Sequence, residues 1–533
     1  MVISRMRPTL RLSRTLRTCT LSGAALALTA AGAAAQRRQL RFPIEETSIA
    51  DIHRAMRAGT LTCRTLVQGY LRRIEAYDRT GPGLNTLVVV NADALRVADS
   101  LDLRVRQRAP LGALHCIPVI VKDNFETVGL PTTAGSLSLS GFVSTRDAFL
   151  VRRVREAGAI VLAKSNMAEF AFSPYETVNS ILPGYTKNPY ALDRVTAGSS
   201  GGTAAAVAAN LGEVGLGTDT GNSIRGPSAH QALVGIRSTM GLTSRAGVVP
   251  LNLSADIAGP MARTVADAVA VFQVVAGYDA DDSVTAASRD RAIPDYAASL
   301  VRDGLRGARI GVLRQAYERP TTDTEVVAVF GRALGDLRRA GATVVDTVLI
   351  PGLDSLLRSQ TGGCNPFKFD FARWAASAGG PPPVKTVDEV LKTGRYHPSI
   401  QKRLEVAQAV ELAPEQNPGC RSRDRFREGL RAAVLRTLDS LRLDAFVYPT
   451  WSNPPRLIGD LNTPHGDNSQ LFSPSTGWPA IQVPMGYTRG GTLPAGITFF
   501  GRAWSEAALI KLAYAYEQTT HHRHAPLSAP PLR

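Results

Sequence analysis

The stretch "AGSSGGTAAAVAANLGEVGLGTDTGNSIRGPSA" at residues 197–229 decides the fold of this chain. A glycine- and serine-rich loop at 198–202 opens directly into a helix of small residues. From residue 213 onward, "EVGLGTDTGNSIRGPSAHQALVGI" predicts a strand, a tight loop and a second helix. Helices that alternate with buried strands in this way are typical of a layered α/β protein.

Further buried strands are predicted on both sides of this stretch. Upstream, "LHCIPVIV" at 114–121 is an apolar run rich in β-branched residues, with Cys116 inside the predicted strand and Lys122 directly after it. Pro118 cannot donate to a strand ladder, so regular pairing on one side should begin after it. "AIVLAK" at 159–164 predicts a second strand.

The C-terminal part of the chain continues the same alternation. "DAFVYPT", "AIQVPM" and "AGITFFG" predict short buried strands, and "EAALIKLAYAYEQ" predicts a closing amphipathic helix. We therefore expect an α/β fold with one large mixed sheet and helices on both of its faces. Residues from about 352 to 445 are mostly helical in pattern and are interrupted by "GGPPPV". We interpret them as a variable insertion or lid on a single domain that spans 36–533.

The first 35 residues have a different composition from the rest. Five arginines without any acidic residue precede an apolar run from Leu21, and three alanines stand before Gln36. This order is that of a secretory signal cut after Ala35. The run holds about fifteen residues, fewer than the ~20 that a spanning helix needs, so a membrane anchor fits less well. We expect an exported protein, periplasmic or extracellular, without stable membrane insertion.

The mature chain keeps a positive excess when the five leader arginines are taken from the net charge of +16. Its Lys and Arg residues are scattered, without a basic stripe interleaved with aromatic residues or a recognisable nucleic-acid module. We therefore expect a solvated basic surface and no nucleic-acid partner. The sequence indicates no oligomeric state.

Four cysteines remain after the leader: Cys63, Cys116, Cys364 and Cys420. None stands at the spacing of a metal site. In an oxidising compartment a pair of cysteines can persist as a disulfide. Cys364 and Cys420 both lie in loop sequence with Gly and Pro nearby, whereas Cys116 falls in a predicted strand, so we favour a Cys364–Cys420 bridge.

The loop at 198–202 admits several interpretations. A phosphate-binding loop would need a lysine after the glycines, and Thr203 follows instead. A dinucleotide fingerprint needs a preceding strand, and polar residues precede this loop. "GSSGG" does satisfy G-x-S-x-G, the nucleophile elbow of α/β-hydrolases, but an elbow follows a strand, and "NPYALDRV" at 188–195 is not predicted to form one.

The elbow interpretation would make Ser200 the nucleophile of a Ser-His-Asp esterase, with His230 or His465 as its base. It remains the alternative to the lysine-based mechanism described below. The terminal histidines form a polar tract that we interpret as a solvated tail and not as a metal site: His521, His522 and His524.

Several motifs that stand in a fixed order resemble the amidase signature family of serine hydrolases. They are "PVIVKDN" at 118–124, "AGSSGGTAAAVAA" at 197–209, "GTDTGNSIRGPSA" at 217–229, "VGIRSTMGLTSRAGVVP" at 234–250 and "AGPMARTVADA" at 258–268. The resemblance runs from about Ile49 to the end of the chain and is weakest between 352 and 445. It implies the amidase signature fold and the hydrolysis of small-molecule amides, with no metal or organic cofactor.

The resemblance also implies a role for individual residues. Ser223 would be the nucleophile, Ser199 a bridging serine held through a cis peptide, and Lys122 the base. The backbone amides of four consecutive residues would form the oxyanion hole: Thr220, Gly221, Asn222 and Ser223. Three further residues would fix the loops by hydrogen bonds: Ser200, Asp219 and Arg225. We expect the substrate pocket to be lined by the segment 352–445, by residues 177–181, and by Phe170, Ala171, Phe172 and Ser173.

The chemistry of lysine supports the assignment of Lys122 independently. A lysine with an ordinary pKa near 10.4 is neutral in only about one molecule in 2,500 at pH 7, so a lysine base must be desolvated. Lys122 ends an apolar run that can supply this burial. Alternate strand residues point to opposite faces, so the carboxylate of Asp123 should be directed elsewhere.

Two features of the sequence limit what the resemblance implies. The family commonly has glycine where Asn222 stands, and the Asn side chain would narrow the site beside the nucleophile, although Asn readily adopts a positive φ. A glutamine-dependent amidotransferase subunit shares the same signature. The predicted leader argues against that function, because tRNA-linked chemistry is cytoplasmic.

Overall fold

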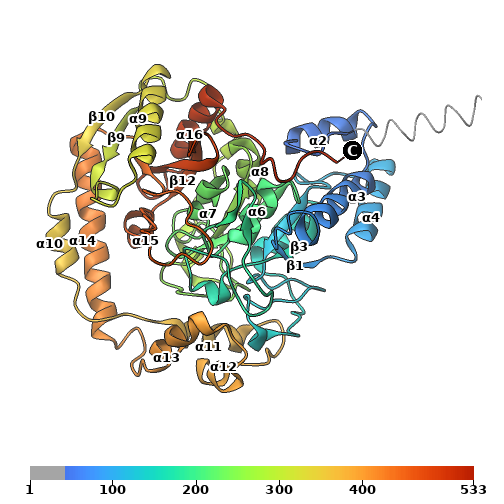
Figure 1. Ribbon diagram of the computed structural model, residues 1–533, viewed down its shortest axis with the longest axis horizontal. Helices are drawn as coiled ribbons and strands as arrows, with labels where there is room; N and C mark the ends of the chain where they lie inside the picture. The colour runs from blue at the N-terminus through green and yellow to red at the C-terminus, as the bar shows by residue number, and fades with distance from the viewer. Residues whose placement is uncertain (1–41, 533) are drawn as a thin grey trace, which may run out of the picture.

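The computed structural model describes residues 42–532, and the predicted leader lies outside them (Figure 1). Eleven strands form one sheet in the order β1-β3-β2-β6-β8-β7-β12-β13-β11-β9-β10. The bounds of its strands are β1 Leu87–Val90, β2 Pro118–Lys122, β3 Ile160–Ser165, β6 Val214–Asp219, β7 Val234–Arg237, β8 Ile257–Ala262, β9 Arg309–Leu313, β10 Thr343–Val348, β11 Ala445–Pro449, β12 Ala480–Thr488 and β13 Leu493–Phe500. Strand β2 is parallel to β3 and β6, whereas β6 and β8 are antiparallel. The predicted mixed sheet is confirmed.

Helices cover both faces of this sheet. Every residue of β2, β3, β6, β7, β8 and β11 is buried, and successive strand residues point to opposite faces, so neither face is open to solvent. The helices that pack on the sheet include α5 Phe149–Glu156, α6 Gly201–Ala208, α7 Arg225–His230, α8 Val265–Val275, α9 Thr324–Arg339 and α16 Glu506–Thr520. At the N-terminal end α3 Cys63–Ile74 and α4 Ala94–Arg106 lie beside β1 and β3, and α2 Ile49–Arg57 lies near the C-terminal end of the chain (Figure 1).

The strand predicted at 114–121 begins later than its hydrophobic pattern indicates. Residues 113–116 form a turn in which Cys116 has φ 65°, and Cys116 is joined to Cys63 in a disulfide. The placement of Cys116 inside a strand was therefore wrong, because an apolar run can be buried as a turn as well as a strand. Pro118 pairs with Ile160 of β3, and pairing with β6 begins one residue later, as the missing N–H of proline predicts.

The interpretation of "NPYALDRV" as lacking a strand was also wrong. Residues Ala191–Val195 form β5, which pairs with β4 Lys187–Asn188 in a separate two-stranded sheet. Strand β5 contains two charged residues, and Val195 is its one buried residue, so it has no continuous apolar signal. Pairing with a local partner stabilises this strand without a buried face.

The segment 352–445 is helical, as its pattern predicts. It contains α10 Leu353–Arg358, α11 Phe367–Ser377, α12 Val387–Thr393, α13 Gln401–Gln408 and the long helix α14 Pro418–Ser440. Figure 1 shows α11, α12 and α13 at one edge of the molecule, with α10 and α14 running between this edge and the strands β9 and β10. The predicted disulfide between Cys364 and Cys420 is present and ties the start of α14 to the loop before α11.

A buried carboxylate fastens this helical segment to the sheet domain. Glu126, fully buried four residues after β2, accepts hydrogen bonds from the Trp374 indole N–H at 3.0 Å and from the Gly379 amide at 2.9 Å. Arg146 lies 3.3 Å from the same carboxylate. Within residues 42–532, no helix has both the length and the apolar character needed to cross a membrane.

Candidate active site

Lys122 is the last residue of β2 and is completely buried. Its Nζ donates hydrogen bonds to Ser199 Oγ at 2.7 Å and to Thr218 Oγ1 at 2.6 Å. Burial lowers the pKa of Lys122 to about 7, and the negative charges of Asp256 and Asp219 oppose this shift. A large fraction of the lysine is therefore neutral near pH 7, which is what a general base requires.

The neighbouring carboxylate points away from this lysine, as the alternation of strand residues predicts. Asp123 lies 3.3 Å from Lys164 Nζ and accepts hydrogen bonds from the amide and hydroxyl of Thr133. Lys164 in turn donates to the carbonyls of Phe125 and Pro131. Asp123 therefore has its own cation and does not form an ion pair with Lys122.

The serine-rich loop places Ser199 against Lys122 by close backbone packing. The peptide bond between Gly198 and Ser199 is cis, as the family resemblance implies. A Cβ atom at Gly198 would lie 2.4 Å from the carbonyl oxygen of Ser173, and one at Gly201 would lie 2.0 Å from Thr177 Oγ1. These glycines are needed because any side chain would separate the loop from the segment 173–177.

The second loop carries Ser223 at the entrance to α7. Its hydroxyl is mostly buried and donates to Asn222 Oδ1 at 3.4 Å. Within residues 42–532, none of the backbone N–H groups of residues 220–223 donates a hydrogen bond to a protein acceptor. Unpaired N–H groups beside a serine are what an oxyanion hole presents. No hydrogen bond joins Ser199 to Ser223 in the part of the chain described, so that link of the triad stays a prediction.

Asp219 and Arg225 form a buried ion pair beneath this loop. Asp219 accepts hydrogen bonds from the amides of Ile224 and Arg225 at 3.2 and 3.3 Å and from Arg225 Nε at 3.1 Å. Burial alone would raise the pKa of Asp219, but Arg225 and Arg237 lower it to about 2. Asp219 therefore stays ionised and holds the turn that ends on Ser223.

Arg237 was not among the residues that the sequence identified. It is fully buried, lies 3.0 Å from Asp219 and also donates to the Ala255 carbonyl at 2.8 Å. It belongs to the motif "VGIRSTMGLTSRAGVVP", so the motif contained a signal for it. Arg237 ends a strand whose other residues are buried, and a fully buried arginine is rare unless it is paired with an acidic residue.

Asn222 keeps the loop compact without a positive φ, since it is absent from the non-glycine residues in the left-handed region. Its side chain is buried, and Nδ2 donates to the Pro174 carbonyl at 3.4 Å while Oδ1 accepts from Ser223. The amide therefore lies beside Ser223, where we expected it to narrow the site.

The geometry does not support the Ser-His-Asp alternative. Ser200 Oγ donates to the Thr218 carbonyl at 3.2 Å and accepts from the Thr218 amide at 3.3 Å. His230 stacks on Trp451, burial lowers its pKa to about 3, and in residues 42–532 no hydrogen bond joins it to Ser200. His465 stacks on Tyr175 and accepts from the Asp467 amide. Neither histidine is placed as the base for Ser200.

The aromatic residues predicted at the pocket pack beneath the helical segment. Phe170 is 1% exposed and lies edge-on to Phe367 and Phe371 of α11, and the Phe172 ring lies 4.7 Å from that of Phe367. Ala171 lines a small cavity together with Thr220. The contact of this segment with substrate stays a prediction.

One cluster of potential metal ligands occurs in the described part of the chain, namely Cys63, His115 and Cys116. His115 Nε2 lies 3.8 Å from the sulfur of Cys63. Because the two sulfurs are joined in a disulfide, the cluster offers no thiolate to a metal ion.

The chain is similar to amidases along most of its length. The family model described as Amidase matches residues 65–510. A probable amidase of Arabidopsis thaliana is 33% identical over 524 residues, which cover 94% of this chain and 95% of the relative. A glutamyl-tRNA(Gln) amidotransferase subunit from Halorhodospira halophila is 34% identical over 91% of this chain and 99% of its own length.

Solved structures show the same similarity. The native peptide amidase from Stenotrophomonas maltophilia superimposes with a TM-score of 0.80 at 37% identity, over 91% of this chain and 99% of that one. A complex of peptide amidase PAM with the competitive inhibitor chymostatin gives a TM-score of 0.79 at 37% identity, over 91% of this chain and 100% of that one.

Proposed function

This chain belongs to the amidase signature family and hydrolyses amide bonds, and we propose that it does so with Ser223, Ser199 and Lys122 as its catalytic triad. The observation that carries this proposal is the environment of Lys122. A fully buried lysine with a pKa near 7 that donates to a serine hydroxyl is equipped to remove a proton from it.

The reaction proceeds through two proton transfers and an acyl-enzyme. Neutral Lys122 takes the proton of Ser199 as Ser199 takes that of Ser223, and the Ser223 oxygen attacks the amide carbon. The backbone N–H groups of residues 220–223 stabilise the oxyanion that forms. The same proton transfers, run in reverse, carry the proton from Lys122 through Ser199 to the leaving nitrogen, because an unprotonated amine anion is too poor a leaving group. Water then releases the acid from Ser223.

For the substrate we propose the primary amide at the carboxyl end of a peptide. The support is the similarity to peptide amidase at 37% identity over nearly the whole chain. The half-buried Tyr175 follows Pro174, whose carbonyl accepts a hydrogen bond from the Asn222 side chain, so an aromatic residue lies close along the chain to the proposed nucleophile.

A panel of matched amides tests this substrate class. We expect kcat/KM for short peptide amides to exceed that for free glutamine and for simple aliphatic amides by at least about a hundredfold, since only the peptide uses the additional contacts. Release of ammonia together with the peptide acid should be measured by mass spectrometry. Preference for glutamine would contradict the proposal and favour an amidotransferase-like function.

We also propose that the protein is exported and begins at Gln36 after cleavage. The basic, apolar and small-residue order of the first 35 residues supports this, and so does the pair of disulfides, which persist in oxidising compartments. N-terminal sequencing of protein recovered outside the cytoplasm should give Gln36. Recovery of the intact Met1 terminus in that fraction would contradict cleavage.

A further inference from the structure

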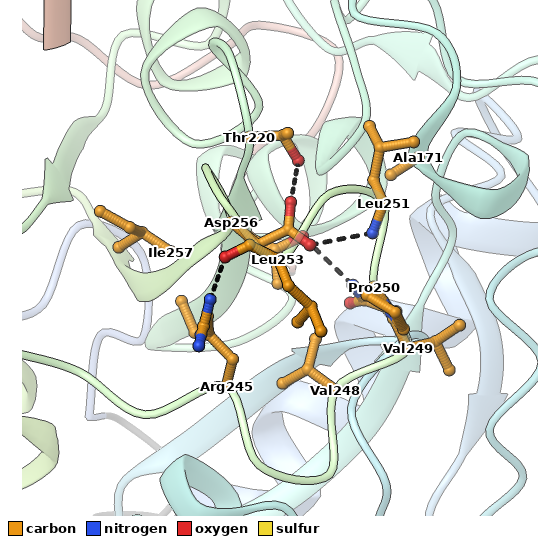
Figure 2. Close-up of a pocket in the computed structure, with 13 residues that line it drawn as sticks. Ala171, Thr220, Arg245, Val248, Val249, Pro250, Leu251, Leu253, Asp256 and Ile257 are labelled. Carbon is orange, nitrogen blue, oxygen red and sulfur yellow. Dashed lines mark hydrogen bonds between the residues drawn. The ribbon is translucent and has the colours of Figure 1, made fainter. Parts of the chain in front are cut away.

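Asp256 lies directly before β8 and is 5% exposed. Its carboxylate accepts a hydrogen bond from Thr220 Oγ1 at 2.5 Å and one each from the amides of Leu251 and Asn252 at 2.9 Å. Figure 2 shows the carboxylate between the Thr220 hydroxyl and the Leu251 amide, beside a small cavity. Thr220 is the first residue of the loop that carries Ser223.

Hydrogen bonds, and not an ion pair, compensate the charge of Asp256. In residues 42–532, no Lys or Arg nitrogen lies within 4.0 Å of this carboxylate, whereas Asp219 has two arginines. A buried carboxylate without an ion pair is unfavourable unless hydrogen bonds compensate its desolvation. The three donors to Asp256 supply that compensation, so the carboxylate is fixed in place.

The loop 251–256, which supplies the Leu251 and Asn252 amides, is itself held from two sides. Arg237 donates both to the Ala255 carbonyl and to Asp219, so it joins the loop 251–256 to the end of β6. Asp370 of α11 accepts from the Leu253 amide at 2.9 Å and joins the same loop to the helical segment. Asp256 therefore connects loop 251–256, which these contacts hold in place, to the loop 220–223 through the Thr220 hydroxyl. We call residues 220–223 the oxyanion loop.

We propose that Asp256 is a positioning residue for hydrolysis, because its hydrogen bond to the Thr220 hydroxyl fixes residues 220–223, which carry the proposed oxyanion donors. The inference rests on the proposed triad and oxyanion hole. Backbone donors stabilise the transition state only when they are aimed at the developing oxyanion, so a small displacement of Thr220 lowers kcat.

Two substitutions test the contact between Asp256 and Thr220 from its two sides. Thr220→Val removes the hydroxyl but keeps the backbone N–H, and Asp256→Asn removes the charge with little change of shape. We expect kcat to fall ten- to hundredfold in each, with KM within about threefold of wild type. In the double variant the losses should be clearly less than multiplicative, because both changes break the same contact.

The split between kcat and KM distinguishes positioning from a general structural role. A displaced oxyanion donor weakens the transition state and leaves ground-state binding of the substrate nearly unchanged, whereas a disrupted fold would change both. Ser254→Ala changes an exposed residue of the same loop whose hydroxyl donates to Asn252, and it should behave as wild type.

Wild-type kcat in Thr220→Val, fully multiplicative losses in the double variant, or a loss that appears in KM and not in kcat would overturn the proposal. If Asp256→Asn fails to fold, as seen by loss of its thermal transition, Thr220→Val still decides the question. Failure of the proposed triad would be seen separately, as activity that survives Ser223→Ala.

Discussion

Replacing Lys122 with methionine should lower amide turnover by at least about a thousandfold while the protein stays folded. The substitution keeps a long apolar stem in a fully buried site and removes the amine that donates to Ser199. Without a base, neither serine loses its proton and the nitrogen leaving group receives none. Steady-state kinetics on one peptide amide, together with the thermal unfolding transition, measures the effect.

The same lysine should set the pH dependence of the native enzyme. Burial lowers its pKa to about 7, and the neutral form is the proposed base, so kcat should rise as pH increases through about 7 and then level off. The linked effect on stability has the same sign. The unfolded chain binds the proton more tightly, so stability rises with pH between about 7 and the unfolded pKa of 10.5. At neutral pH the methionine variant should therefore be at least as stable as wild type.

His465→Ala is the matched control for the choice of base. His465 stacks on Tyr175 outside the triad, so its loss should change kcat by less than about tenfold. A folded Lys122→Met protein with near-native turnover, or a His465→Ala protein that is inactive, would contradict the lysine mechanism.

Replacing Ser223 with alanine should abolish covalent labelling by a fluorophosphonate and reduce turnover by a factor on the order of 10⁵ or more. Ser223 is the serine that lies beside unpaired backbone N–H groups, and only an activated serine next to such donors reacts with these reagents. Intact-mass measurement shows whether one label is added, and peptide mapping locates it.

Ser200→Ala is the informative comparison. The Ser200 hydroxyl bonds to the backbone of Thr218, so its variant should still be labelled at Ser223, although at a reduced rate if the loop shifts. A label on Ser200 in the native enzyme, or labelling that persists in Ser223→Ala, would revive the nucleophile-elbow alternative.

The prediction of the fold from sequence succeeded where burial is strong and continuous. The apolar runs that became β3, β11, β12 and β13 and the small-residue helix α6 lie where their patterns placed them. It failed at Cys116 and at β5. An apolar turn closed by a disulfide has the same composition as a strand end, and a largely exposed strand paired with a local partner has no continuous apolar pattern.

By itself the sequence determined the class of fold, because this depends on local hydrophobic patterns and on motifs that are contiguous in the chain. It favoured the disulfide between Cys364 and Cys420 but gave no sign of the one between Cys63 and Cys116. Its motifs also singled out Lys122, Ser199 and Ser223 as the proposed triad. Only the tertiary structure decided which groups act on them. Arg237 bonds to Asp219 at the end of β6 across 18 residues of sequence, and Asp256 bonds to Thr220 across 36. Asp370 bonds to the Leu253 amide across 117 residues. Such contacts follow from the order in which strands join the sheet, and local periodicity carries no record of that order. The burial that shifts the pKa of Lys122 has the same origin, since the strands and helices that exclude water from it come from distant parts of the chain.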